Sequence, residues 1–316
     1  MRELLTTFCR GREIQLLWQP EPETIPELMG EGFIPIEMAE GTVSYVDFRC
    51  LDHHNDYSHL PSACVTALAF YGTLGEDAPA RLMVNHTDAD SVLTGVTLMG
   101  LLPRELLEEL NPEVGLLDTD PLNMNAEGLR YGDAIRLWRA GMASVRRSGW
   151  SWLYGVQLFL DLFCHFDRYA KKIDQLQEGE RARREQALKD YARAVLGPSG
   201  KVLLVAPSTV RGHDVHFFRQ EAFSPTSLEG WRHWCVISHV EKAGNVMLAC
   251  PNKEVAERAF GAGGLKNVFP LLPNLEGREW GGRESVGGSP RGVVFPVDLL
   301  AEVLSIVERS LRGKTA

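Results

Sequence analysis

The chain has 316 residues, of which 44% are hydrophobic and 24% are charged, and its formal net charge is -9. These values lie in the ordinary globular range and exclude a disordered, collagen-like or disulfide-dense protein. The length favours two domains. The charge is unevenly divided, with 23 acidic and 11 basic residues in 1–150 but 19 and 22 in 151–316. An acidic half disfavours a groove for duplex nucleic acid and allows a metal site, because cations reverse the local field.

The six cysteines are scattered and form no CxxC motif, which is typical of buried free thiols in a reducing cytosol. Charges interrupt the apolar residues at the N-terminus, so we expect no signal peptide. The longest apolar stretch, 150–166, is broken by polar residues and is too short to span a bilayer. These features predict a cytoplasmic protein without membrane attachment and leave its oligomeric state open.

The first half of the chain alternates short apolar runs with helical patterns. Residues rich in β-branched, aromatic or aliphatic side chains predict strands at 42–48, 81–85 and 114–117. Helical patterns predict helices at 64–71, opened by Pro61, at 91–102, ended by Pro103, and at 126–147. This alternation predicts an α/β domain with a mostly parallel sheet.

The rest of the chain predicts a helical connector and a second, smaller α/β domain. One or two long helices are expected over 150–196, where a charge run at 178–186 is typical of a solvated helix face. Beyond a Gly-Pro-Ser-Gly break, strands are expected at 201–206, 236–240, 246–249 and 292–295, and helices at 254–260 and 297–311. We therefore divide the chain into an N-terminal α/β domain (1–148), a connecting helical segment (149–197) and a C-terminal α/β domain (198–316).

Two clusters of histidine and aspartate follow the first two expected strands. They are Asp52, His53 and His54 in one cluster, and His86, Asp88 and Asp90 in the other. In a parallel sheet both clusters would lie at the carboxyl edge, where ligands bind. Imidazole and carboxylate together suit Mn²⁺, Zn²⁺ or Fe²⁺, and several carboxylates in one site can hold two ions. Two independent clusters outweigh the simpler interpretation of hydrogen-bonded turn residues.

Three motifs resemble those of a known family. Leu51-Asp52-His53-His54 resembles the Asp-His-His signature of the DHH phosphoesterase superfamily, which includes RecJ-type exonucleases and manganese pyrophosphatases. His86-Thr87-Asp88-Ala89-Asp90-Ser91 is similar to its His-x-Asp-x-Asp motif, and Asp118 after 114–117 resembles its strand-end aspartate. In the family the Asp-His-His motif comes last, whereas here it comes first. Either the chain is a permuted relative of this family, or its likeness to the family is convergent.

The resemblance implies a metal-dependent phosphoesterase with about two Mn²⁺ ions, with Mg²⁺, Zn²⁺ or Fe²⁺ as other possible cofactors. His53 and His54 would be the catalytic residues, with His53 also a metal ligand. The implied ligands are Asp52, His53, His86, Asp88, Asp90 and Asp118. The implied substrate is a small phosphorylated molecule or a short oligonucleotide. Alanine at Asp88 or Asp90 is expected to remove metal with little damage to the fold.

A glycine-rich segment in the second domain resembles the family's substrate loop, in which backbone amides and basic side chains approach the substrate. Its candidate substrate-binding residues are Gly281, Gly282, Arg283, Gly287, Gly288 and Arg291. Glycines permit such close approach, and arginine can bind phosphate with two hydrogen bonds. A glycine-rich surface turn is the alternative. Asp47, Asp120 and the histidines at 213 and 216 are weaker candidates.

Two other functions remain open. His86-Thr87-Asp88 is also the His-x-Asp half of the facial triad of a non-haem iron oxygenase, although that class expects a β-rich jelly roll. A non-catalytic binding protein could share the fold. The phosphoesterase hypothesis makes the sharpest structural prediction: strands ending at 48, 85 and 117 share one parallel sheet, and Asp52, His86 and Asp118 converge at its edge.

Overall fold

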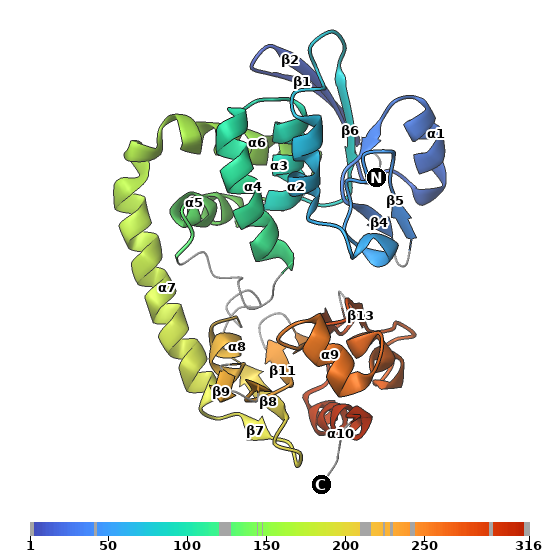
Figure 1. The fold of residues 1–316 in the computed structure, drawn as a ribbon, viewed down its shortest axis with the longest axis vertical. Coiled ribbons are helices and arrows are strands. Elements are labelled where there is room, and N and C mark those ends of the chain that lie inside the picture. The colour runs from blue at the N-terminus through green and yellow to red at the C-terminus, as the bar shows by residue number, and fades with distance from the viewer. Residues whose placement is uncertain are drawn as a thin grey trace. The chain divides into compact units, whose positions relative to one another are not determined.

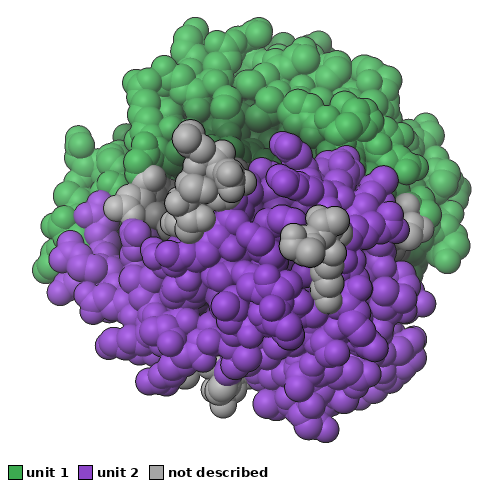
Figure 2. Space-filling view, turned by 60° about the horizontal axis from the view of Figure 1, so that its bottom comes forward, with its two compact units in different colours: residues 1–119, 126–176 green, residues 120–125, 177–316 purple. Residues whose placement is uncertain are grey.

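The computed structural model describes residues 3–40, 43–119, 128–143, 145–146, 148–208, 216–223, 225–227, 230–240, 244–290 and 293–312. The chain divides into two compact units, 1–119 with 126–176 and 120–125 with 177–316 (Figure 2). The division falls within the long helix α7 (Ala170–Tyr191), so the expected connector at 149–197 is shared between the units. None of the helices in the described ranges is both long and apolar enough to cross a bilayer.

Unit 1 is built on a four-stranded sheet in the order β1-β2-β6-β3 (Figure 1). Its strands are β1 (Glu3–Cys9), β2 (Arg12–Trp18), β3 (Ile34–Pro35) and β6 (Ala80–Val84). β1 is antiparallel to β2, whereas β6 runs parallel to both β2 and β3. The sequence analysis did not anticipate β1, β2 or β3. The α/β class with parallel strand pairs is confirmed.

Helices cover both faces of this sheet. They are α1 (Ile25–Gly30), α2 (Ala63–Ala67), α3 (Ala89–Leu98), α4 (Arg104–Thr119), α5 (Gly132–Met142) and α6 (Gly149–Cys164). Because side chains alternate along a strand, Leu16 joins the core formed with α3 and α6, and Leu17 joins the core formed with α1. This two-sided burial explains why the central strand β6 is almost continuously apolar.

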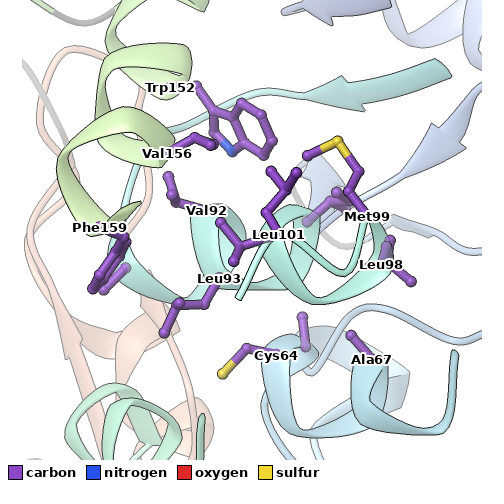
Figure 3. Packing of buried hydrophobic residues seen from close by; sticks show 14 of the residues in the cluster. Cys64, Ala67, Val92, Leu93, Leu98, Met99, Leu101, Trp152, Val156 and Phe159 are labelled. Carbon is purple, nitrogen blue, oxygen red and sulfur yellow. The ribbon is translucent and has the colours of Figure 1, made fainter. Parts of the chain in front are cut away.

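Helix α3 lies at the centre of the main core of unit 1, between α6 and α2 (Figure 3). All ten of its residues are buried. Its close approach to α6 depends on Gly95, where a Cβ atom would lie 2.4 Å from the ring of Trp152. Val92 and Val156 pack in the same layer. The helix that follows the His86 motif is thus fixed on both sides.

Two expected strands differ from the structure. Within 42–48 only β5 (Val43–Tyr45) is a strand, and it pairs with β4 (Met38–Glu40) in a separate antiparallel ribbon. Residues 114–117 are not a strand but the last turns of α4. Their apolar side chains continue a buried helical stripe with Leu107 and Leu110 at spacings of three and four, and this periodicity outweighs the interior Pro112.

Unit 2 contains a six-stranded sheet in the order β13-β14-β12-β11-β8-β7. These strands are β7 (Val195–Leu196), β8 (Val202–Ser208), β11 (Cys235–Val240), β12 (Asn245–Ala249), β13 (Gly281–Gly282) and β14 (Val286–Gly288). Only the β8–β11 pair is parallel. Short strands β9 (Pro225–Ser227) and β10 (Gly230–Trp231) pair separately. The helices are α8 (His216–Ala222), α9 (Lys253–Phe260) and α10 (Leu300–Ser310).

One expected strand of unit 2 is absent. Of 292–295, only Val293 to Phe295 are described, and they form no strand. Phe295 is buried against Trp280, with ring centroids 5.5 Å apart, and its amide donates to the carbonyl of Gly244. Side-chain packing and the backbone bond to Gly244 therefore hold this segment.

Candidate metal centre

Glu37 lies at the carboxyl edge of the parallel strands of unit 1. The amide of Ile36 donates to the carbonyl of Met83 on β6 (3.0 Å), which aligns the end of β3 with the end of β6. Glu37 itself has a positive φ of 48°, and its amide donates to the carbonyl of Leu51 (2.8 Å). The Asp-His-His segment is thereby brought beside Glu37.

His53 is at the centre of a buried cluster and is only 2% exposed. Its Nε2 lies 2.7 Å from Glu37 Oε1, 3.0 Å from Asp118 Oδ2 and 3.4 Å from Asp90 Oδ2. Three carboxylates from separate elements therefore surround one imidazole nitrogen. Such a set of hard oxygen and borderline nitrogen donors suits a divalent transition metal.

Asp90 is held by the start of α2 as well as by its own helix. Its carboxylate accepts hydrogen bonds from the amides of Ala63 (3.0 Å) and Cys64 (2.7 Å). Burial, followed by the negative charges of Glu37 and Asp118, raises the pKa of Asp90 well above its usual value. A bound cation would remove this repulsion, because it neutralises the neighbouring charges.

His86 and Asp88 form a second group with Glu37. His86 Nε2 lies 3.0 Å from Asp88 Oδ2 and 3.3 Å from Glu37 Oε2. Burial acts to lower the pKa of His86, but Asp88 and Glu37 outweigh it and raise this pKa to about 11. Asp88 also caps α3, since its Oδ1 accepts the amide of Ser91 (2.8 Å). The capping box explains why this motif begins a helix.

Asp118 reaches the cluster from the last turn of α4. Helix α4 is fixed to its neighbours by Asn111, whose amide group donates to the carbonyl of Cys64 and to Thr97 Oγ1. It approaches α2 closely at Gly115, where a Cβ atom would lie 2.3 Å from Ser62 Oγ. A helix, and not the expected strand, therefore presents this aspartate.

Asp52 is engaged by His54 and belongs to none of the candidate metal-binding groups. Its Oδ1 lies 2.7 Å from His54 Nδ1 and accepts the backbone amide of the same residue (3.1 Å). Burial acts to raise the pKa of Asp52, but the hydrogen bond with His54 and further bonds lower it overall. The structure thus gives Asp52 an orienting contact with His54, and its place among the ligands stays a prediction.

Within the described part of the chain, three groups of donors have ligand atoms within 4.8 Å of one another, and Glu37 belongs to each. The groups are Glu37, His53 and His54; Glu37, His53, Asp90 and Asp118; and Glu37, His86 and Asp88. Glu37 Oε2 is buried and faces His86 Nε2 at 3.3 Å, while its Oε1 faces His53. A buried carboxylate whose two oxygens each face an imidazole, within a mixed N/O donor set, fits a metal ligand.

The two motifs converge, but three strands of one parallel sheet do not bring them together as predicted. Of the three expected strands, only the one before His86 belongs to the main sheet, yet His53, Asp90 and Asp118 still meet Glu37. The sequence analysis missed Glu37 altogether. Its available signal was an acidic residue directly after the apolar run Phe33-Ile34-Pro35-Ile36, a pattern like that used for the other clusters.

The glycine-rich segment of unit 2 is an edge hairpin and not an open loop. β13 and β14 pair with each other, and β14 continues the sheet next to β12. The glycines fit close packing: a Cβ atom on Gly287 would lie 2.2 Å from the ring of Phe269, and Gly282 has a φ of 151°. The amide of Arg283 donates to the carbonyl of Val286 across the turn.

The remaining candidates are Asp47, Asp120, His213, His216 and Arg291. Asp47 forms an ion pair with Arg49. Arg291, Asp120 and His213 lie outside the described residues, and His216 is the first residue of α8 in unit 2.

Comparison with protein-family models, with curated proteins and with solved structures found no match to this chain. The functional argument therefore rests on the chemistry and geometry of its own residues.

Proposed function

We propose that the chain is a metal-dependent phosphoesterase of the DHH type, with its motifs in permuted order. The observation that supports this most directly is the meeting of both sequence motifs at Glu37, within 4.8 Å. Glu37, His53, Asp90 and Asp118 would hold one ion, and Glu37, His86 and Asp88 the other. Mn²⁺ is the preferred ion because the ligands mix imidazole and carboxylate.

Two divalent ions supply Lewis-acid activation of water and neutralise the charge that develops on a phosphoryl group. The chain's own contribution is to fix the ligands. The start of α2 orients Asp90, and the capping box of α3 orients Asp88. Glu37 links the two groups, which requires the two ions to be close neighbours.

His54 is the residue that we assign to proton transfer. Asp52 Oδ1 lies 2.7 Å from its Nδ1 and fixes the ring orientation. His54 also belongs to a candidate metal-binding group with Glu37 and His53, and we assign its ring to donate a proton to the leaving oxygen while the other donors hold the ions. The His54 side chain is 32% exposed, so a substrate can reach it. The acidic character of residues 1–150 supports a small phosphorylated substrate or a short oligonucleotide over duplex nucleic acid.

The test combines metal content with hydrolysis. We expect about two Mn²⁺ ions per chain by elemental analysis, and Mn²⁺-dependent cleavage of bis(p-nitrophenyl) phosphate. His54→Gln should keep the ions and lose about 10²- to 10⁴-fold in rate, as expected for loss of a general acid. His59→Gln is the matched control, because His59 is exposed and its Nδ1 lies 3.0 Å from the carbonyl oxygen of Asp56.

A wider panel then identifies the substrate. Nucleotides, cyclic dinucleotides, pyrophosphate and sugar phosphates should be tested with Mn²⁺, Mg²⁺, Zn²⁺ and Fe²⁺. Failure to hydrolyse any of them, together with full metal loading, would refute the phosphoesterase assignment. Consumption of dioxygen by the Fe²⁺ protein would favour the oxygenase alternative instead.

A further inference from the structure

Two cysteines of unit 2 lie directly opposite each other at one end of the β11–β12 pair. The antiparallel register places Val236 opposite Ala249, so the next pair is Cys235 and Cys250. The amide of Cys235 donates to the carbonyl of Lys201 (3.2 Å), and that of Cys250 donates to the carbonyl of Ser285 (2.7 Å). Both amides therefore point away from the partner strand. This is the non-hydrogen-bonded position, where opposite side chains come closest.

The register brings the two thiols together. Burial, followed by the hydrogen bond to Cys235, raises the pKa of the Cys250 thiol well above its usual value. Neither side chain is exposed, and both lie in the core that β8, β11 and β12 form with α9 and α10. The Cα separation of about 4.5 Å that is typical of this position falls within the range that a disulfide accepts.

The other four cysteines belong to the other compact unit. Cys9, Cys50, Cys64 and Cys164 all belong to unit 1. Within unit 2, Cys235 and Cys250 can therefore pair only with each other. The cysteines are scattered along the chain, but the register of β11 and β12 brings these two together.

We propose that Cys235 and Cys250 are an oxidation site that forms a cross-strand disulfide with a low-molecular-weight disulfide as the oxidant. One thiolate attacks the oxidant and releases one molecule of thiol, which gives a mixed disulfide. The second cysteine then displaces the other thiol, so the chain loses two electrons and two protons and the oxidant gains both. This inference is independent of the proposed metal chemistry.

Burial determines when the reaction occurs. Because both sulfurs are covered, exchange requires either folding in the presence of the oxidant or opening of unit 2. Once formed, the bridge closes the loop 235–250 and is protected by the same burial. The amide of Cys250 also donates to the carbonyl of Ser285, in the turn between β13 and β14. The bridge would therefore fix β11 and β12 to each other, next to β14.

The experiment refolds the full chain in oxidised glutathione and compares it with chain refolded in dithiothreitol. We expect a mass loss of about two daltons, and a peptide map in which Cys235 is linked to Cys250. Closing a loop of this length should raise the melting temperature by roughly 5–10 °C, and dithiothreitol should reverse the shift.

Cys235→Ala and Cys250→Ala should each abolish the mass loss, and Cys164→Ala, in unit 1, is the control that should retain it. The peptide map of the wild-type chain does not depend on how the variants fold. Retention of all six thiols after oxidative refolding, or a bridge to a cysteine of unit 1, would overturn the proposal.

Discussion

Glu37→Gln tests the proposed metal centre at its most connected residue. The substitution keeps the side-chain volume and a hydrogen-bond acceptor for His53, but removes the negative charge. Glu37 is 1% exposed and belongs to all three groups of candidate ligands. If the assignment is correct, both ions lose one charged ligand at once.

The expected loss of Mn²⁺ affinity can be estimated from the behaviour of metal sites in general. Removing a group that only supports a ligand typically costs about tenfold to hundredfold in metal affinity. Loss of a direct charged ligand should cost at least as much for each ion, which corresponds to about 1.4–2.8 kcal/mol per ion. Because Glu37 contacts both His53 and His86, we expect both binding steps to weaken.

The assay is calorimetric titration of metal-free protein with Mn²⁺, with circular dichroism as a check on folding. Glu76→Gln is the matched control, because Glu76 is an exposed carboxylate of the same unit paired with Arg12. Glu37→Asp should give an intermediate affinity, since it keeps the charge on a shorter side chain. If Glu37→Gln folds and binds two Mn²⁺ ions with wild-type affinity, Glu37 is not a shared ligand and the two-ion arrangement is wrong.

Three further predictions concern the elements around the site and the interior of unit 2. Gly115→Ala should destabilise the fold by about 1–3 kcal/mol and weaken Mn²⁺ binding, because the new Cβ would push α4 from Ser62; unchanged urea unfolding would contradict this. In metal-free protein, charged His86 contributes stability that is complete below pH 6.5 and is lost as the pH rises toward about 11. Wild type should therefore lose stability relative to His86→Gln between pH 6.5 and 10, and parallel urea-unfolding curves would refute the ion pair. Arg219→Met should stabilise unit 2 by about 1–3 kcal/mol, because buried Nε and Nη1 of Arg219 have no hydrogen-bond partner in the described ranges; a lower melting temperature would exclude this.

The local geometry of one motif was predictable from the sequence. Residues 82–84 are apolar, and Asp88 and Ser91 form a capping box, so a strand followed by a helix is specified within a dozen residues. The α/β class follows from the same kind of local pattern. Periodicity and capping depend on neighbouring residues, so a sequence reveals them directly.

Tertiary structure decided the composition of the candidate site. Glu37 reaches it only because β3 aligns with β6 and its amide binds Leu51, contacts that join segments far apart in the chain. Asp52 forms a hydrogen bond with His54, which the sequence alone did not predict. Asp118 lies in the last turn of a helix, although the short apolar run before it resembles a strand. Such placements depend on packing between distant elements, as at Gly115 and Ser62. The sequence shows which ligand types are present, namely imidazole and carboxylate. The distances between these ligands are set only when α2, α3 and α4 pack together.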